Sequence, residues 1–100
     1  MNELIRQAQL MQKKMLKTQE EMGKKEVEAS VGGGMVAVKA NCSGEVLAVR
    51  IDPAVMESGD VDMLQDLILS AVNEALKKGK DMMQAEMSQL TGGMKIPGLF

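Results

Sequence analysis

The sequence predicts an α+β fold of the order helix, three-stranded antiparallel meander, helix. Three observations carry this prediction. Helix formers without proline run from Asn2 to about Lys25, the apolar period switches to two between Glu26 and Ile51, and a helical period returns from Asp60 to about Leu90. The length of 100 residues suits one small domain. We expect that domain over residues 1–91, followed by a flexible tail over residues 92–100 that contains glycine and proline.

The first helix is predicted to pack against another helix. Its apolar residues follow one another by four, three, four and seven positions, which keeps them on one narrow stripe. The members of this stripe are Leu4, Ala8, Met11, Met15 and Met22.

The middle of the chain alternates apolar and polar residues, as half-buried strands do. Gly32–Gly34 is predicted to be a hairpin turn that tolerates positive φ. Strands flank it on both sides, whereas a phosphate-binding glycine loop opens a helix, so we do not interpret it as a nucleotide site. Asn41–Gly44 forms the next turn, and Asp52 with Pro53 ends the last strand. The predicted strands are Glu26–Val31, Met35–Ala40 and Glu45–Ile51.

The second long helix is expected to begin after Asp60, whose carboxylate can cap the free amides of the first turn. A single helical turn through Met56 is expected before it. Gly92 and Gly93 stop the helix after about Leu90. Two adjacent apolar stripes run along it, formed by Leu64, Ile68, Ala71, Ala75 and Met82 and by Leu67, Val72, Leu76, Met83, Met87 and Leu90.

The lengths of these elements favour a two-fold homodimer. The helices would measure roughly 36 and 43 Å, whereas strands of six or seven residues span only about 20 Å. The apolar stripes nevertheless continue to the distal ends, at Met22, Met82, Met87 and Leu90, and a second copy would cover them. The alternative is that the two helices of one chain cover each other as an antiparallel hairpin.

The composition argues against an enzyme. The chain has no histidine and a single cysteine, Cys42, so it offers no Ser-His or Cys-His pair and no clustered thiolate metal site. We expect Cys42 to act as a small hydrophobe, and we expect no cofactor, metal or small-molecule substrate. One aromatic residue in the whole chain leaves no stacking platform for single-stranded nucleic acid. The 11 methionines favour core filling, or else an adaptable surface for a partner helix.

The chain is predicted to be soluble and cytoplasmic, without a membrane partner. No apolar stretch approaches the ~20 residues of a membrane span, and the first residues are charged and amphipathic. The net charge of −2 and the pI near 5.1 argue against nucleic acid as a partner unless cations gather locally.

Such a local gathering is present on the first helix. Arg6, Lys13, Lys17 and Lys24 fall within roughly 20° of one direction and form a line about 27 Å long, opposite the apolar stripe. Lys14 and Lys25 flank this line, and Lys77, Lys78 and Lys80 form a second cluster. A row of lysines suits phosphate contact with little base readout. The alternative is an ordinary solvated face, in which Glu20 and Glu21 pair with Lys24 and Lys25.

Several segments taken in order resemble the YbaB/EbfC family of nucleoid-associated proteins, and the resemblance covers nearly the whole chain. Two departures are a longer turn at Asn41–Gly44 and the absence of a glycine-rich lead-in before the first helix. The matching segments are Arg6–Met15, Gly32–Val36, Gly44–Val46, Ile51–Pro53, Met63–Ile68, Ala71–Ala75, Gly92–Met94 and Pro97–Phe100.

The resemblance implies a tweezer-like homodimer that binds double-stranded DNA in the nucleoid, without catalysis, and that alters DNA conformation, nucleoid organisation or gene expression. The main alternative is a non-catalytic module whose Met-rich grooves bind a partner helix. The DNA-binding residues that the resemblance implies are Arg6, Lys13, Lys14, Lys17, Lys24 and Lys25, with Lys77 and Lys78 as a second group.

Overall fold

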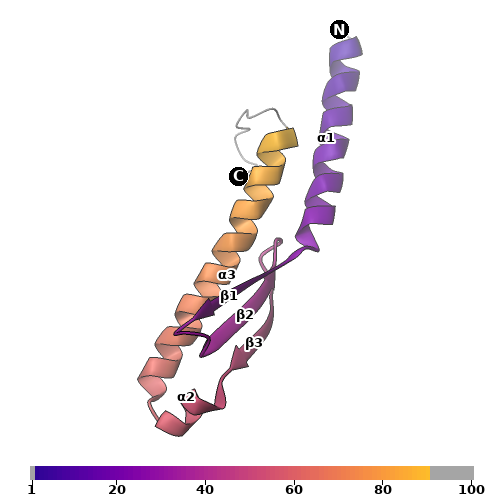
Figure 1. The fold of residues 1–100 in the computed structure, drawn as a ribbon. Helices are drawn as coiled ribbons and strands as arrows, with labels where there is room; N and C mark the ends of the chain where they lie inside the picture. Colours follow the sequence, from indigo (N-terminus) through magenta and orange to yellow (C-terminus); the bar gives the residue numbers. More distant parts are fainter. Residues whose placement is uncertain (1, 91–100) are drawn as a thin grey trace.

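A computed structural model describes residues 2–90 and confirms the predicted α+β fold (Figure 1). The predicted tail lies outside the described residues. Two long helices stand at the ends of the described chain, and a three-stranded antiparallel sheet and a short helix lie between them. In chain order the elements are α1 (Asn2–Gly23), β1 (Glu26–Val31), β2 (Val36–Asn41), β3 (Val46–Ile51), α2 (Pro53–Ser58) and α3 (Val61–Leu90).

The sheet is a meander of the order β1-β2-β3. Val38 of β2 pairs with Ala29 of β1 and with Val49 of β3, so these three residues lie on the same face of the sheet. On β1 and β2 this face is buried, as the period of two predicts. The turn at Gly32–Gly34 has positive φ at all three glycines, as expected for this hairpin. The core comprises Val27, Ala29, Val36, Val38, Ala40, Cys42, Ala71 and Ala75.

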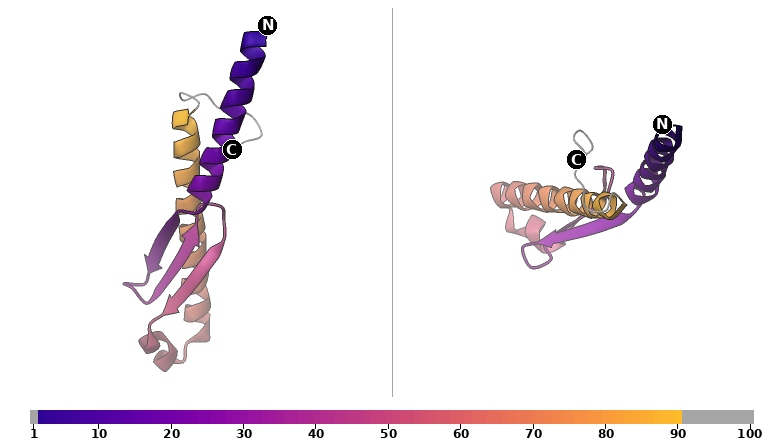
Figure 2. Two further views of the ribbon diagram at one scale, coloured as in Figure 1. Left: turned by 90° about the vertical axis from the view of Figure 1, so that its right-hand side faces the viewer. Right: turned by 90° about the horizontal axis from the view of Figure 1, so that it is seen from above.

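Helix α3 covers this face along β1 and β2 (Figure 2). Ala71 and Ala75 are fully buried where it meets the strands, and these small side chains let helix and sheet approach closely. The α3 contacts concentrate on β1 and β2, so β3 remains largely uncovered. Leu47 and Val49, which the alternation predicts on a covered face, are therefore about half exposed, at 48% and 45%.

The connection from β3 to α3 uses two capping aspartates. Asp52 accepts a hydrogen bond from the Ala54 amide at 2.9 Å and caps α2, whose first residue is Pro53. Asp60 accepts one from the Met63 amide at 3.0 Å, which confirms the predicted start of α3. This connection returns the chain to the sheet face, where α3 packs.

Helix α1 projects past the end of the sheet (Figure 1). Met15 and Met22 are buried, but Leu4 at the distal end is 69% exposed, so the predicted stripe is covered only near the sheet. Met87, which we expected to need a second copy, is buried within one chain and lies beside α1. The radius of gyration is 18.5 Å, whereas a compact domain of this length has about 13 Å. The molecule is therefore a rod of 67 × 19 × 17 Å.

One boundary differs in a way that affects the predicted site. Helix α1 ends at Gly23, because the chain turns there into β1, and Lys24 and Lys25 follow the helix. The predicted line of four helical cations is thus wrong at its last member, Lys24.

Candidate nucleic-acid interface

The distal part of α1 carries positive charge without acidic neighbours in the sequence. The 16 residues from Leu4 to Gln19 contain four cations and no aspartate or glutamate, although the whole chain has a net charge of −2. Residues 6, 13 and 17 lie on one line of the helix, since they differ by seven and four positions, and residue 14 lies beside that line. All four cations are exposed: Arg6, Lys13, Lys14 and Lys17.

None of these cations forms an ion pair within residues 2–90. The two ion pairs found there lie on the sheet, between Lys39 and Glu26 at 3.6 Å and between Arg50 and Glu28 at 4.0 Å. The four-residue pairing of Glu20 and Glu21 with Lys24 and Lys25, which would make this an ordinary solvated face, is not formed in this structure. The charges of α1 therefore remain available to an external anion.

The spacing of the cations suits a polyanion. Arg6 and Lys17 are eleven residues apart, which is about 17 Å along the helix. Duplex DNA presents one phosphate charge per ~1.7 Å of axis, so this length faces on the order of ten phosphates. The observed line is shorter than the predicted ~27 Å because Lys24 lies outside the helix.

An apolar side chain that was not predicted at this site, Leu10, interrupts the cationic face. Leu10 is 57% exposed, and it borders a shallow hollow of about 520 Å³ together with Met11. The lysines at positions 13, 14 and 17 complete the rim of this hollow. The signal was available in the sequence, because position 10 is four residues from position 14 and seven from position 17, and so shares their side of the helix.

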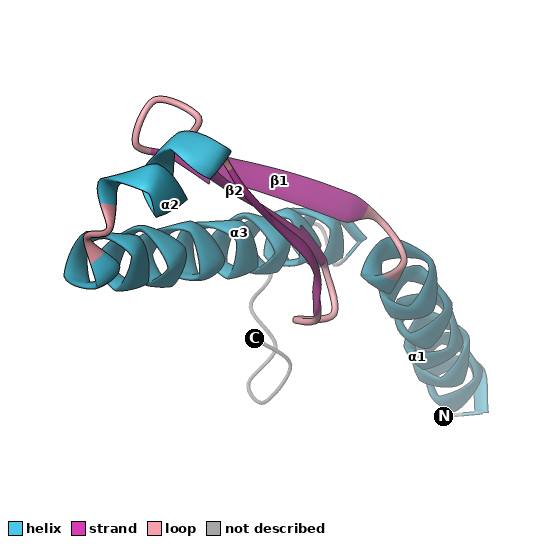
Figure 3. Ribbon diagram, turned by 90° about the horizontal axis from the view of Figure 1, so that it is seen from below, coloured by secondary structure: helices cyan, strands magenta, loops and turns pink. Residues whose placement is uncertain are grey.

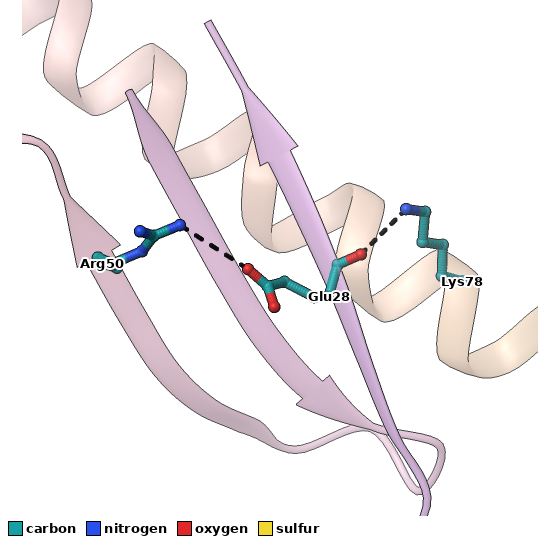
Figure 4. Close-up of polar contacts among 3 residues, drawn as sticks. All are labelled: Glu28, Arg50 and Lys78. Carbon is teal, nitrogen blue, oxygen red and sulfur yellow. Dashed lines mark hydrogen bonds and ion pairs between the residues drawn. The ribbon is translucent and has the colours of Figure 1, made fainter. Parts of the chain in front are cut away.

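The second predicted group of cations lies elsewhere. Lys78 donates a hydrogen bond from Nζ to the backbone carbonyl of Glu28 at 3.0 Å, and the Glu28 carboxylate pairs with Arg50 (Figure 4). Lys77 and Lys78 are exposed on α3, where Lys78 reaches β1, whereas the α1 cations lie on the helix that projects past the sheet (Figure 1). Within one chain the structure does not bring the two groups together.

Lys24 and Lys25 stand between these groups, at the junction of α1 and β1, and both are exposed. Lys25 accepts a hydrogen bond at its backbone oxygen from the Cys42 amide, at 3.0 Å. Burial raises the pKa of the Cys42 thiol, and the nearby Lys25 ammonium lowers it by a smaller amount. Cys42 is buried in the core, as expected of a small hydrophobe.

Residues 2–90 contain neither a metal site nor a membrane span. No cluster of three cysteine, aspartate or glutamate side chains is placed to hold a metal ion. No helix in this part of the chain is both long and apolar enough to cross a membrane.

The fold and the exposed cations define a class, an α+β protein with a basic helical arm that can contact a polyanion. Sequence comparison gives the family: the YbaB/EbfC DNA-binding family matches residues 1–94, and the chain belongs to it. Proteins named "Nucleoid-associated protein" from Pelotomaculum thermopropionicum and Alkaliphilus metalliredigens are each 52% identical over 100 residues. These alignments span the whole chain and 95% and 88% of the two relatives.

A solved structure has the same fold. The crystal structure of HP0035 from Helicobacter pylori superposes with a TM-score of 0.79 at 25% sequence identity. The superposition covers 92% of this chain and 97% of that one. The predicted resemblance to the family is thus confirmed.

Proposed function

We propose that this protein is a nucleoid-associated homodimer that binds duplex DNA with low sequence selectivity through the cations of α1. The single observation that carries the proposal is the acid-free run from Leu4 to Gln19, whose four cations are exposed and form no ion pair within residues 2–90. Membership of a DNA-binding family supplies the partner. Binding along the helices would bend or bridge DNA, and so alter nucleoid organisation and gene expression.

Low selectivity follows from the kind of side chains on this surface. Three of the four are lysines, which act as flexible point charges on phosphates, whereas base readout relies on bidentate arginine, asparagine or glutamine. Affinities for AT-rich and GC-rich duplexes of equal length are therefore expected to agree within a few-fold. Binding should instead depend steeply on salt, because each neutralised phosphate releases counterions.

A second copy is supported by the apolar side chains that one chain leaves open. They lie on two surfaces, the projecting part of α1 and the edge strand β3, and an uncovered edge strand is a site for pairing. We propose that the homodimer covers them. The exposed side chains in question are Leu4, Ile5, Leu16, Val46, Leu47 and Val49.

The oligomeric state is tested by the mass in solution. Sedimentation equilibrium should give twice the chain mass of 10.8 kDa at micromolar concentration, and Val49→Lys should raise the dimer dissociation constant at least about tenfold. A lysine on the partner surface of β3 places a charge in an apolar interface. A native mass of one chain at tens of micromolar would overturn the homodimer.

The DNA surface is tested by two triple variants that lose the same charge. The first variant, on α1, changes Arg6, Lys13 and Lys17 to glutamine. The second variant is the control and changes three other exposed cations to glutamine: Lys39, Arg50 and Lys80. We expect the first variant to bind a 30-base-pair duplex at least about tenfold more weakly at 50 mM salt, and to lose about 0.9 of log-log salt slope per contact removed. The second variant should bind like the native protein.

Fluorescence anisotropy at four salt concentrations gives both quantities. Equal losses in the two variants would show that total charge, and not the α1 surface, governs binding. No binding of the native protein to duplex at low salt would refute the proposed function altogether.

The alternative function, capture of a partner helix, has one observation in its favour. A hollow of about 380 Å³ lies between α1 and α3, lined mostly by apolar or methionine side chains, among them Met11, Met15, Leu16 and Met87. Methionine-lined grooves adapt to apolar helix faces. Partner binding that persists at 1 M salt and survives the α1 charge variant would favour this alternative over DNA binding.

A further inference from the structure

The segment Asn41–Glu45, which we call the joint turn, links β2 to β3 and contacts both long helices. We propose that it is the joint that sets the direction of α1 relative to α3, and so positions the cations of α1 on DNA. The effect on DNA binding rests on the proposed function, whereas the direction of α1 relative to α3 does not depend on it. The turn itself carries no cation, and its hydrogen bond to Lys25, a predicted DNA contact, joins backbone atoms only.

The first contact is with the end of α1. The Cys42 amide donates a hydrogen bond to the Lys25 carbonyl at 3.0 Å, immediately after the helix. Gly23, the last residue of α1, is buried against the turn, since a Cβ placed on it would lie 3.3 Å from the Ser43 Cβ. The exit of α1 is thus held at two neighbouring positions.

The second contact is with the middle of α3, at Gly79. A Cβ on Gly79 would lie 2.8 Å from the Asn41 carbonyl oxygen and 3.2 Å from the Cys42 Cα, so only glycine fits this approach without a shift of backbone. The Cys42 thiol also donates to the Met82 sulfur at 3.6 Å. A glycine inside a helix costs about 1 kcal/mol relative to alanine, and close packing here is a physical reason for it.

The joint turn is held by hydrogen bonds that converge on the side chain of Asn41. Asn41 is 9% exposed, and its Oδ1 accepts from the Ser43 amide at 3.1 Å, the Ser43 hydroxyl at 2.8 Å and the Glu45 amide at 3.0 Å. Its Nδ2 donates to the Glu45 carboxylate at 3.1 Å. One asparagine side chain therefore organises the turn on which both helices rest.

A small change at this point is amplified along α1. The helix has 22 residues and is about 33 Å long, so a rotation of about 10° at Gly23 moves Arg6 by roughly 4 Å. That displacement exceeds the reach of a hydrogen bond, so the cations would no longer meet the phosphates together. The joint turn thus contains positioning residues, which act on DNA through the direction of α1.

The test measures that direction and DNA affinity separately. Spin labels are placed on α1 and α3 by Gln9→Cys and Ser70→Cys, both exposed, in a Cys42→Ala background, with labelled chains diluted in unlabelled protein. Double electron-electron resonance then gives the distance within one chain. We expect Asn41→Leu to broaden this distribution by several ångströms and to weaken duplex binding about tenfold, with the mass in solution unchanged.

Two further variants separate positioning from a general loss of structure. The double variant Asn41→Asp with Glu45→Gln keeps an acceptor at position 41, and the side-chain amide at position 45 now donates to the carboxylate at position 41. It should therefore keep both the narrow distance distribution and the affinity for duplex DNA. Gly79→Ala should shift the mean distance without removing any hydrogen bond of the turn, and it serves in place of Asn41→Leu if that variant does not fold by circular dichroism.

Unchanged distances in Asn41→Leu and Gly79→Ala would overturn the joint. Changed distances with native DNA affinity would overturn the positioning role. If the native protein binds no DNA, the proposed function fails, while the distances still decide whether the turn directs α1.

Discussion

Helices α1 and α3 have the same kind of amphipathic sequence but opposite surroundings. Of the 30 residues of α3, Ala71, Ala75, Gly79 and Met87 are buried in one chain, and several larger side chains pack beside them. In α1, a similar share is fully buried, namely Met15, Met22 and Gly23 among 22 residues, but its remaining large apolar side chains are exposed instead of packed on a core. Figure 3 shows α3 lying along the sheet and α1 directed away from it. An apolar stripe therefore marks the face of a helix that can pack, but not how much of that face one chain covers.

The difference arises from the small residues of α3. Positions 71, 75 and 79 recur every four residues and expose little more than backbone to the sheet, so many van der Waals contacts form at short distance. The stripe of α1 consists mainly of long methionine and leucine side chains with no sheet beneath them. Helix α3 thus packs on the sheet, whereas most of the α1 surface is exposed in one chain.

The largest expected effect is a loss of folding stability, caused by a charge placed between α3 and the sheet. Ala71→Asp would bury a carboxylate without a partner and should lower the free energy of unfolding by more than about 3 kcal/mol. Ala85→Asp on the exposed side of the same helix is the matched control and should change it by less than about 0.5 kcal/mol. Urea denaturation followed by circular dichroism measures both. Equal losses would contradict the assignment of α3 as the buried helix.

An intermediate effect distinguishes the cations of the two helices. Lys13→Gln on α1 should reduce the magnitude of the negative log-log salt slope of duplex binding by about 0.9. It should also weaken binding several-fold. Lys78→Gln on α3 should leave the slope unchanged, because Lys78 lies along the sheet and already donates to the Glu28 carbonyl. Anisotropy titrations at several salt concentrations measure the slopes. A larger change for Lys78 would move the DNA surface from α1 to α3.

The smallest effect concerns the thiol beneath α3. Because burial raises the pKa of Cys42 in the folded state, the unfolded chain loses this proton first as the pH rises. The contribution of Cys42 to stability is therefore present below the ordinary thiol pKa and is lost as the pH rises through the folded-state pKa. The urea concentration at the midpoint of denaturation should therefore decrease as the pH rises through this alkaline range. The decrease should be smaller in Cys42→Ala.

A chemical assay checks the same burial. Reaction of the thiol with an aromatic disulfide reagent at pH 8 should be at least about tenfold slower in the folded protein than in urea. Equal rates would mean that Cys42 is accessible in the folded state.

The sequence by itself determined which elements form and in what order. Local patterns carry this information: the period of two over β1 and β2, the positive-φ glycines at 32–34, the strand end at Asp52 and Pro53, the cap at Asp60, and the line of Arg6, Lys13 and Lys17 on one side of a helix. The family resemblance was visible for the same reason, since it rests on short segments in a fixed order.

Only the tertiary structure decided what covers each element. Sequence periodicity marks apolar faces but not distances between them, so it could not show that α3 lies over β1 and β2 and leaves Val49 half exposed, or that Met87 is buried within one chain. It also placed Lys24 on the helix, although the chain turns at Gly23 to enter the sheet. The approach of Gly79 to Asn41 joins residues 38 positions apart, and such a contact exists only once the helix has packed on the sheet.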